Sequence, residues 1–266
     1  MKKIKFFVFV ISALTIVGCT GYNKVLKSDD YTSKFEMANE LYDDGQELRS
    51  IALYEQVYQR MPKTGEGELA YFRIGKGYYL AGDYYMAGYY LGQFHQRFSM
   101  SKQAEQALFL SAMCSVKNSP EFSLDQNETD LAINDLQQFI DKFPASTLLD
   151  SCNSIIDGLR FKLEQKEFNV VKLYSKTANY RAATSAALTF MADYPMSQFN
   201  EDVSYLLVLN SYLLSKNSVE IKKKERIDQT IERYRTFVAS FPDSDNIGLV
   251  TGYYKEMELE KLKDQK

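Results

Sequence analysis

The chain has 266 residues and a formal net charge of −3, which excludes the strongly basic signature of a nucleic-acid-binding protein. Its 20 Tyr and 17 Phe, with no Trp and only 5 Pro, are typical of a packed, aromatic-rich fold rather than a disordered chain. The single histidine, His95, leaves too little material for a histidine-based metal or nucleophile site, so we expect no catalytic residues, no metal and no cofactor.

The N-terminus has the pattern of a secretory signal that is removed from the mature protein. Three lysines among the first five residues precede an apolar run over residues 6–17, which is shorter than the roughly 20 residues of a membrane span. The run ends at Ile16-Val17-Gly18-Cys19, which resembles the lipobox of bacterial lipoprotein precursors. The small Gly18 suits cleavage, and the Cys19 thiolate would then take up a diacylglycerol.

We therefore predict a removed signal over residues 1–18 and a lipidated linker over residues 19–30. Several acyl chains on Cys19 would hold the mature protein on a membrane. In bacterial lipoproteins an aspartate after the cysteine favours the inner membrane, and Thr20 stands there instead. The resemblance thus implies a lipid anchor in the outer membrane, on its periplasmic face. An ordinary signal peptide with an incidental cysteine is the weaker alternative, because a lone cysteine there has no structural use.

One junction pattern recurs along the rest of the chain: a large apolar residue, Pro or Ser, any residue, then Ser or Thr. It occurs at residues 61–64, 98–101, 143–146, 194–197 and 241–244. Successive junctions, counted from position 62 to 99, 144, 195 and 242, are 37, 45, 51 and 47 residues apart. Pro stops one helix, and the hydroxyl is expected to cap the next. A period of this length indicates a repeat protein whose unit is a pair of helices.

The second unit carries helix-face, crossing and turn residues at tetratricopeptide spacing: Tyr71, Ile74, Gly75, Tyr78, Gly82-Asp83 and Ala87. Gly75 and Ala87 are small where two antiparallel helices would cross closely, and Gly82-Asp83 is expected to form the turn. The pattern resembles the tetratricopeptide family. The other units follow it more loosely, with a polar loop over residues 118–126 and one long helix or two abutting helices over residues 147–176.

The fourth unit sharpens this resemblance. It is similar to the BamD family, the tetratricopeptide lipoproteins of the outer-membrane β-barrel assembly machinery, in Leu159-Arg160, Lys166-Glu167, Val170-Val171, Tyr174, Tyr180, Ala183 and Tyr194-Pro195-Met196-Ser197. The likeness extends over residues 19–245. Ser99 in place of a junction proline, the expanded polar loop and a further helix after Asn246 depart from that family's pattern.

We accordingly predict an all-α fold, a tetratricopeptide-like superhelical solenoid of about five helix-turn-helix repeats followed by a C-terminal helix. The N-terminal repeats would span residues 31–118, including the first helix of the third repeat. The C-terminal repeats and the terminal helix would span residues 119–262. Cys114 and Cys152 could form a disulfide in an exported protein, but we favour small buried core residues.

Enzyme motifs are present only as short matches. Residues 99–102, 244–246 and 63–65 match the three motifs of penicillin-recognising serine enzymes. Their order along the chain is wrong, and each falls on a predicted helix junction, where Ser, Thr and Gly are expected. We therefore predict that the protein is not an enzyme.

A tetratricopeptide stack offers a concave groove lined by the first helix of each unit. By register, this groove would present Phe35, Asn39 and Tyr42 from the first unit and Phe72, Lys76 and Tyr79 from the second. The rings would stack on aromatic residues of an extended peptide, and Lys76 would meet its terminal carboxylate. Alternatively, Phe35 and Phe72 pack between adjacent helices, as Phe at this spacing often does.

The family resemblance implies a non-enzymatic scaffold that binds unfolded outer-membrane protein segments and a POTRA-bearing, BamA-like barrel protein. The first two units would receive the unfolded segments. Residues 197–262 match the portion that meets the POTRA domains in that family. Another lipid-anchored tetratricopeptide scaffold, serving cell-envelope synthesis or a transport complex, is the alternative function.

Overall fold

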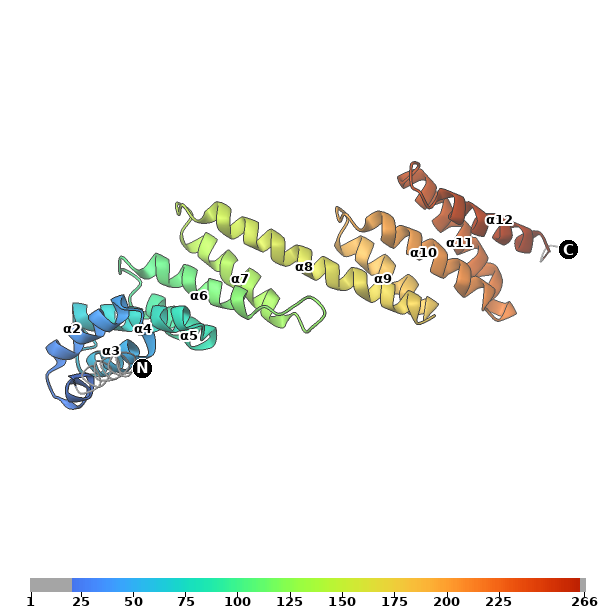
Figure 1. Ribbon diagram of the computed structural model, residues 1–266. Coiled ribbons are helices and arrows are strands. Elements are labelled where there is room, and N and C mark those ends of the chain that lie inside the picture. The colour runs from blue at the N-terminus through green and yellow to red at the C-terminus, as the bar shows by residue number, and fades with distance from the viewer. Residues whose placement is uncertain (1–20, 264–266) are drawn as a thin grey trace, which may run out of the picture. The chain divides into compact units, whose positions relative to one another are not determined.

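The computed structural model describes residues 21–263, and every regular element among them is a helix (Figure 1). The described residues form two compact units, which divide between Ile156 and Asp157. After a short helical stretch over residues 21–27, the helices are α2 (Tyr31–Asp43), α3 (Glu47–Arg60), α4 (Gly65–Ala81), α5 (Tyr84–Arg97), α6 (Ala104–Asn118), α7 (Asn127–Lys142), α8 (Leu149–Lys176), α9 (Tyr180–Asp193), α10 (Asn200–Lys216), α11 (Glu220–Ser240) and α12 (Ile247–Lys263).

The predicted fold class is confirmed. Helices α2 to α11 form five successive helix-turn-helix pairs of tetratricopeptide type, and α12 is the further helix expected after Asn246. The region over residues 147–176 is one helix, α8, rather than two. Cys19 and the predicted signal over residues 1–18 lie outside the described residues.

The junction residues end each pair of helices by the same contact. Met61, Phe98, Phe143, Tyr194 and Phe241 are all C-caps whose backbone N–H donates to the carbonyl four residues earlier. In four of them the ring packs on the fully or almost fully buried Phe one turn before, with centroids 5.1 to 5.6 Å apart. The repeated aromatic residue therefore anchors the end of each pair in its own core.

The predicted hydroxyl caps are right at one junction and wrong at the others. Thr64 is the N-cap of α4, and its Oγ1 accepts from Gly67 N at 3.1 Å. The four serines at the later junctions instead accept from the backbone N–H two residues on, and the N-caps of α6 and α10 are Gln103 and Phe199. A serine hydroxyl readily forms such a local turn, which here places the helix start three residues after the serine.

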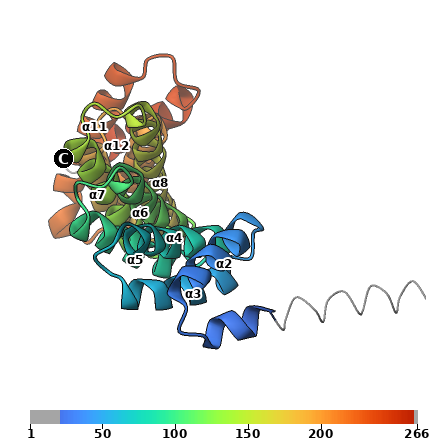
Figure 2. The same ribbon diagram turned by 90° about the vertical axis from the view of Figure 1, so that its left-hand side faces the viewer.

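Helices α4 and α5 of the first unit pack at the close crossing that the sequence predicts (Figure 2). A Cβ atom added to Gly75 would lie 2.8 Å from Leu91 Cγ and 3.1 Å from Leu91 N. Gly82 ends α4 in the left-handed region at φ +82°, and Asp83 caps α5 by accepting from Met86 N at 3.1 Å. The predicted turn is therefore confirmed.

The polar loop after α6 is also confirmed, and hydrogen bonds of the buried Gln126 side chain hold it in place. Gln126 is buried, and its Nε2 donates to the carbonyl oxygens of Glu121 and Leu124 at 2.9 and 3.1 Å. Thr129 Oγ1 donates to Gln126 Oε1 at 2.7 Å. These bonds satisfy a buried polar side chain and join the loop to the start of α7.

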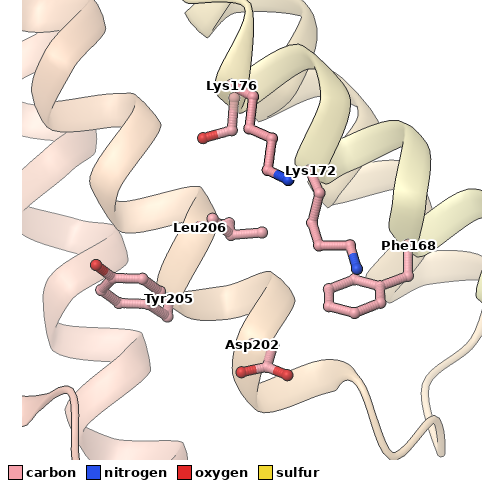
Figure 3. Close-up of a pocket in the computed structure, with 7 residues that line it drawn as sticks. Phe168, Lys172, Lys176, Asp202, Tyr205 and Leu206 are labelled. Carbon is pink, nitrogen blue, oxygen red and sulfur yellow. The ribbon is translucent and has the colours of Figure 1, made fainter.

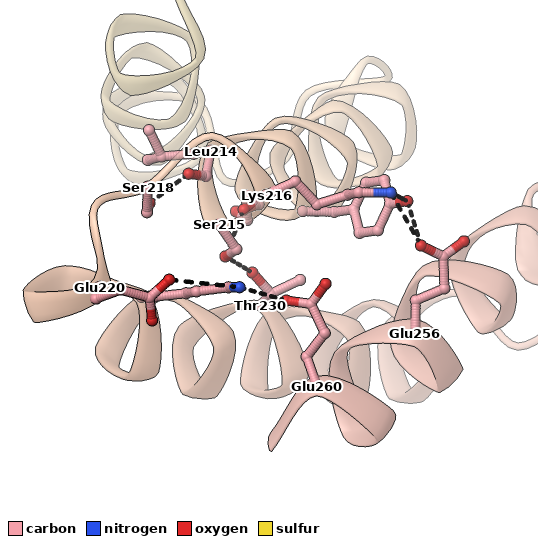
Figure 4. Close-up of polar contacts among 11 residues, drawn as sticks. Leu214, Ser215, Lys216, Ser218, Glu220, Thr230, Glu256 and Glu260 are labelled. Carbon is pink, nitrogen blue, oxygen red and sulfur yellow. Dashed lines mark hydrogen bonds and ion pairs between the residues drawn. The ribbon is translucent and has the colours of Figure 1, made fainter. Parts of the chain in front are cut away.

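In the second unit, α12 packs against α10 and α11 through rings and ion pairs. Tyr253 stacks on Tyr212 and Tyr254 stacks on Tyr234, with ring centroids 4.6 and 4.4 Å apart. Three ion pairs cross between the helices, as Figure 4 shows in part: Lys216 with Glu256 at 3.2 Å, Lys223 with Glu260 at 3.3 Å and Lys261 with Asp228 at 2.7 Å. Met257 is fully buried beneath them.

Candidate functional site

The three residues predicted from the first repeat, Phe35, Asn39 and Tyr42, lie around Tyr54, which is fully buried. Asn39 Oδ1 accepts from Tyr54 Oη at 2.7 Å and from the Arg73 guanidinium at 2.6 Å. Arg73 also donates to Tyr54 Oη at 2.8 Å. Phe35 packs edge-on against the Tyr54 ring, with centroids 6.2 Å apart.

Tyr42 completes this cluster from the end of α2. Its ring packs edge-on against Tyr54, and the Arg73 guanidinium lies 4.9 Å from the Tyr42 ring centroid. Burial raises the pKa of Tyr42 and raises that of Tyr54 to about 12, so both hydroxyls stay protonated at neutral pH. The Tyr42 hydroxyl is buried without a hydrogen-bond partner among the described residues, so this cluster contains one unsatisfied donor.

The three residues predicted from the second repeat, Phe72, Lys76 and Tyr79, lie along α4. Phe72 is buried and packs on Phe94 with centroids 5.3 Å apart, so its ring lies in the core, as in the alternative interpretation. Tyr79 is half-buried against Tyr84. Lys76 is half-buried and makes no hydrogen bond or ion pair within residues 21–263. Lys76 is therefore an available cation one turn from Arg73, beside the half-buried ring of Tyr79.

A second groove, which sequence reasoning missed, lies between the first helices of the fourth and fifth pairs. It encloses about 440 Å³ and is lined by Phe168, Lys172, Ser175 and Lys176 on α8 and by Asp202, Tyr205 and Leu206 on α10. Figure 3 shows Leu206 on α10 pointing toward Lys172 and Phe168 on α8, while the Tyr205 ring extends away from α8. Both helices are the groove-facing type in a tetratricopeptide pair. The groove is thus the second-unit counterpart of the predicted peptide site.

Two lysines give this α8–α10 groove its charge. Lys172 Nζ lies 4.3 Å from the Phe168 ring centroid, and Lys176 is exposed one turn later. Within the described part of the chain no ion pair joins either lysine to Asp202. The groove therefore combines apolar side chains with two lysines and one carboxylate, Asp202, and this excess of positive charge suits a segment carrying both an aromatic ring and a carboxylate.

The described residues also bear on three other kinds of feature: reactive thiols, metal sites and membrane-spanning helices. Cys114 and Cys152 are buried and free, which confirms the core interpretation over a disulfide, and burial raises the pKa of the Cys114 thiol to about 12. Across residues 21–263 no three histidine, cysteine or carboxylate side chains gather where they would hold a metal ion. Every helix in the same range is too short or too polar to span a bilayer.

Comparisons with known proteins add a family. A family described as "YfiO: Outer membrane lipoprotein" matches residues 28–187, which is more than half of the chain. No curated protein matches the chain. Two crystal structures of a Podosopora anserina protein described as a kinesin light chain with nearly identical TPR-like repeats, one of them a point variant, are each 13% identical to it, with a TM-score of 0.33. They cover 80% of this chain and 96% and 97% of their own.

Proposed function

The chain belongs to the YfiO family of outer membrane lipoproteins, and from this membership we propose that it is a non-enzymatic scaffold of the machinery that assembles outer-membrane β-barrel proteins. Cys19 would carry the lipid anchor, and the helix pairs would lie on the periplasmic face of the outer membrane. The family match over residues 28–187 is the observation that carries the proposal. The two cation-bearing aromatic surfaces on first helices of the pairs add support from the geometry.

The first two pairs are proposed to receive unfolded outer-membrane protein segments. Asn39, Tyr42 and Arg73 form a preorganised polar and aromatic wall, and Lys76 and Tyr79 continue it along α4. Phe35 and Phe72 support this wall from the core side rather than meeting the ligand, because Phe72 is buried and Phe35 packs on Tyr54. An amphipathic strand that ends in an aromatic residue and a carboxylate matches these groups.

The last two pairs and α12 are proposed to dock the POTRA-bearing, BamA-like barrel protein. The family match itself covers residues 28–187. The assignment of residues 197–262 therefore rests on their resemblance, in sequence, to the portion that meets the POTRA domains in the BamD family. The α8–α10 groove supports it, because Lys172 and Lys176 offer unpaired cations to an acidic residue of a partner. The two halves of the chain would then hold a substrate segment and the assembly partner at the same time.

Site-specific crosslinking tests this division. A photocrosslinker at position 76 or 79 should capture nascent barrel segments, whereas one on the exposed side of α11, between residues 224 and 240, should capture the POTRA-bearing protein. Met100, which is 96% exposed at a junction, is the matched control site and should capture neither. Swapped captures would refute the division of labour.

Purification tests the broader function. The tagged lipoprotein, purified from gently solubilised envelopes, should bring with it a barrel protein that carries POTRA domains. Recovery of cell-envelope synthesis or transport proteins instead would favour the alternative scaffold. A Cys19→Ser variant should be released from membranes, and continued outer-membrane fractionation of this variant in high salt would refute the anchor.

A further inference from the structure

A third groove lies on the first unit, away from the proposed peptide surfaces. It encloses about 330 Å³ and shares no residue with them; its lining residues are Glu55, Tyr58, Gln59, Tyr71, Ile74, Tyr89, Tyr90 and Arg97, from α3, α4 and α5. We call it the tyrosine groove. Half of its lining residues are tyrosines, which the proposed scaffold function does not use.

The tyrosines of this groove hold one another in place. Tyr71 packs on Tyr58 and on Tyr90 with ring centroids 4.4 and 5.4 Å apart, and Tyr78 stacks on the far side of the same group, 5.6 Å from Tyr90. Tyr89 packs edge-on against Tyr90 and is 58% exposed. A ring fixed this way loses little conformational freedom when a ligand stacks on it.

Three planar polar side chains border the rings, and each keeps hydrogen-bonding capacity in reserve. Glu55 Oε1 accepts from Tyr90 Oη at 3.2 Å, which leaves Glu55 Oε2 as an acceptor. One amino group of Arg97 donates to Tyr58 Oη at 2.9 Å, and the guanidinium lies 5.2 Å from the Tyr71 ring centroid. Gln59 is exposed and makes no hydrogen bond within residues 21–263.

The charged and hydrogen-bonding side chains of the tyrosine groove restrict which class of ligand it can bind. The groove carries one anionic and one cationic side chain, Glu55 and Arg97, so neither sign of net charge is favoured and a ligand without net charge fits best. Glu55 requires a donor and Arg97 requires an acceptor, and a hydroxyl group offers both roles. A proline-rich peptide also packs on tyrosines, but its prolines have no N–H to give to Glu55. A ring that carries several hydroxyls and presents C–H faces to Tyr89 meets every requirement.

We propose that the tyrosine groove binds a neutral sugar unit of a glycan chain. The exposed face of Tyr89 stacks on the sugar ring, Glu55 accepts from one hydroxyl, and Arg97 with Gln59 donates to others. This binding goes beyond the scaffold function, because it would attach the protein to a polysaccharide rather than to a protein partner.

Calorimetric titration of the full-length lipoprotein tests the proposal. The protein is held in a zwitterionic detergent, since maltoside and glucoside headgroups are themselves sugars. The probes are chitotetraose, cellotetraose and maltotetraose, with a proline-rich decapeptide as the competing class. We expect saturable binding of at least one oligosaccharide.

Variants locate the binding. Tyr89→Ala should weaken it by about tenfold through loss of one ring contact, and Glu55→Gln, which keeps an acceptor for Tyr90, should weaken it by about fivefold. Tyr85→Ala is the matched control, because Tyr85 lies one turn earlier on α5, is 68% exposed and does not line the groove. Its affinity should equal that of the unmodified chain, and circular dichroism melting should be the same for all four proteins.

Three results would overturn the proposal. In the first, none of the three oligosaccharides binds to the folded chain. In the second, Tyr89→Ala and Glu55→Gln bind the sugar as well as the unmodified chain does. In the third, the decapeptide alone binds and Tyr89→Ala abolishes its binding, which would make the groove a peptide site.

Discussion

The two compact units pack the same type of helix pair by different means. On α4 of the first unit, a Cβ atom added to Gly67, Gly75 or Gly77 would meet another residue at 1.9 to 3.1 Å. In the second unit, Gly158 and Gly252 have nothing within 4 Å of an added Cβ, and stacked rings and ion pairs join the helices. Rings pack between helices in both units, but α4 of the first unit also requires close backbone approach at three glycines, which Gly158 and Gly252 of the second unit do not. The same Gly→Ala substitution should therefore have opposite effects at Gly67 and at Gly252.

Gly67→Ala should produce the largest effect. The new Cβ would lie 1.9 Å from the Met61 carbonyl oxygen, so the backbone of the junction must move. We expect the free energy of unfolding to fall by about 3 kcal/mol, measured by urea titration. Gly65→Ala in the same turn is the control, because an added Cβ there meets nothing within 4 Å. Equal stability of the two variants would contradict the close-approach account.

Asn39→Ala should come next, because it removes the acceptor shared by Tyr54 and Arg73. Leaving two donors without this partner should lower the free energy of unfolding by about 2 kcal/mol. Asn39→Asp keeps the acceptor and adds a charge opposite Arg73, so it should retain the stability of the unmodified chain. If both variants unfold alike, the hydrogen bonds at Asn39 contribute nothing to stability.

Gly252→Ala should raise stability, the reverse of the result at Gly67. The position is inside α12 with open space around it, so alanine gains helix propensity without a clash. The free energy of unfolding should rise by about 0.5 to 1 kcal/mol. Thermal melting of the second-unit helices would register the change, and a lower melting temperature would show a packing role for Gly252.

Lowering the pH should have the smallest effect, confined to the contact of α12 with α10. The Tyr212 hydroxyl and the Lys216 ammonium hold the pKa of Glu256 below its ordinary value of 4.5. A carboxylate with a lowered pKa stabilises the fold above its unfolded-state pKa, and this stabilisation is lost as the pH falls through the folded-state pKa. Hydrogen-exchange protection of residues 250–260 should thus decrease below about pH 4.5.

A Glu256→Gln variant is the control for this pH effect, since its protection should vary less over the same range. Added salt should also reduce the protection, because both side chains of the pair are exposed. Constant protection in the unmodified chain would show that the Lys216–Glu256 pair contributes little and that the ring stacks and the buried Met257 hold α12.

The fold is largely predictable from the sequence because its determinants act locally. At all five junctions a large apolar residue followed by Pro or Ser ends a helix, and Gly82 forms the turn because that position has a positive φ. The serine caps were mispredicted for a local reason as well, since a hydroxyl forms a turn two residues on as readily as it caps a helix.

The site is less predictable because its contacts are distant in sequence. Helical spacing placed Phe72 in the groove, but its neighbour Arg73 reaches Asn39 and Tyr54, which lie 34 and 19 residues away. Lys172 and Lys176 were visible only as two cations on a long helix. Their common surface with Tyr205 and Leu206 depends on how α8 packs beside α10, and no local pattern encodes that packing.

The serine turns at the junctions have a consequence for how repeats are gained and lost. Ser146 Oγ donates to Glu105 on α6 at 2.6 Å, and Ser197 Oγ donates to Glu164 on α8 at 2.8 Å. Each bond returns from the end of a helix pair to the first helix of that same pair. A duplicated pair would therefore include both the serine and the glutamate of its own hydrogen bond. A deleted pair would remove both of these partners together. Gene duplication could then lengthen or shorten the array by whole pairs without leaving an unmatched carboxylate or hydroxyl behind.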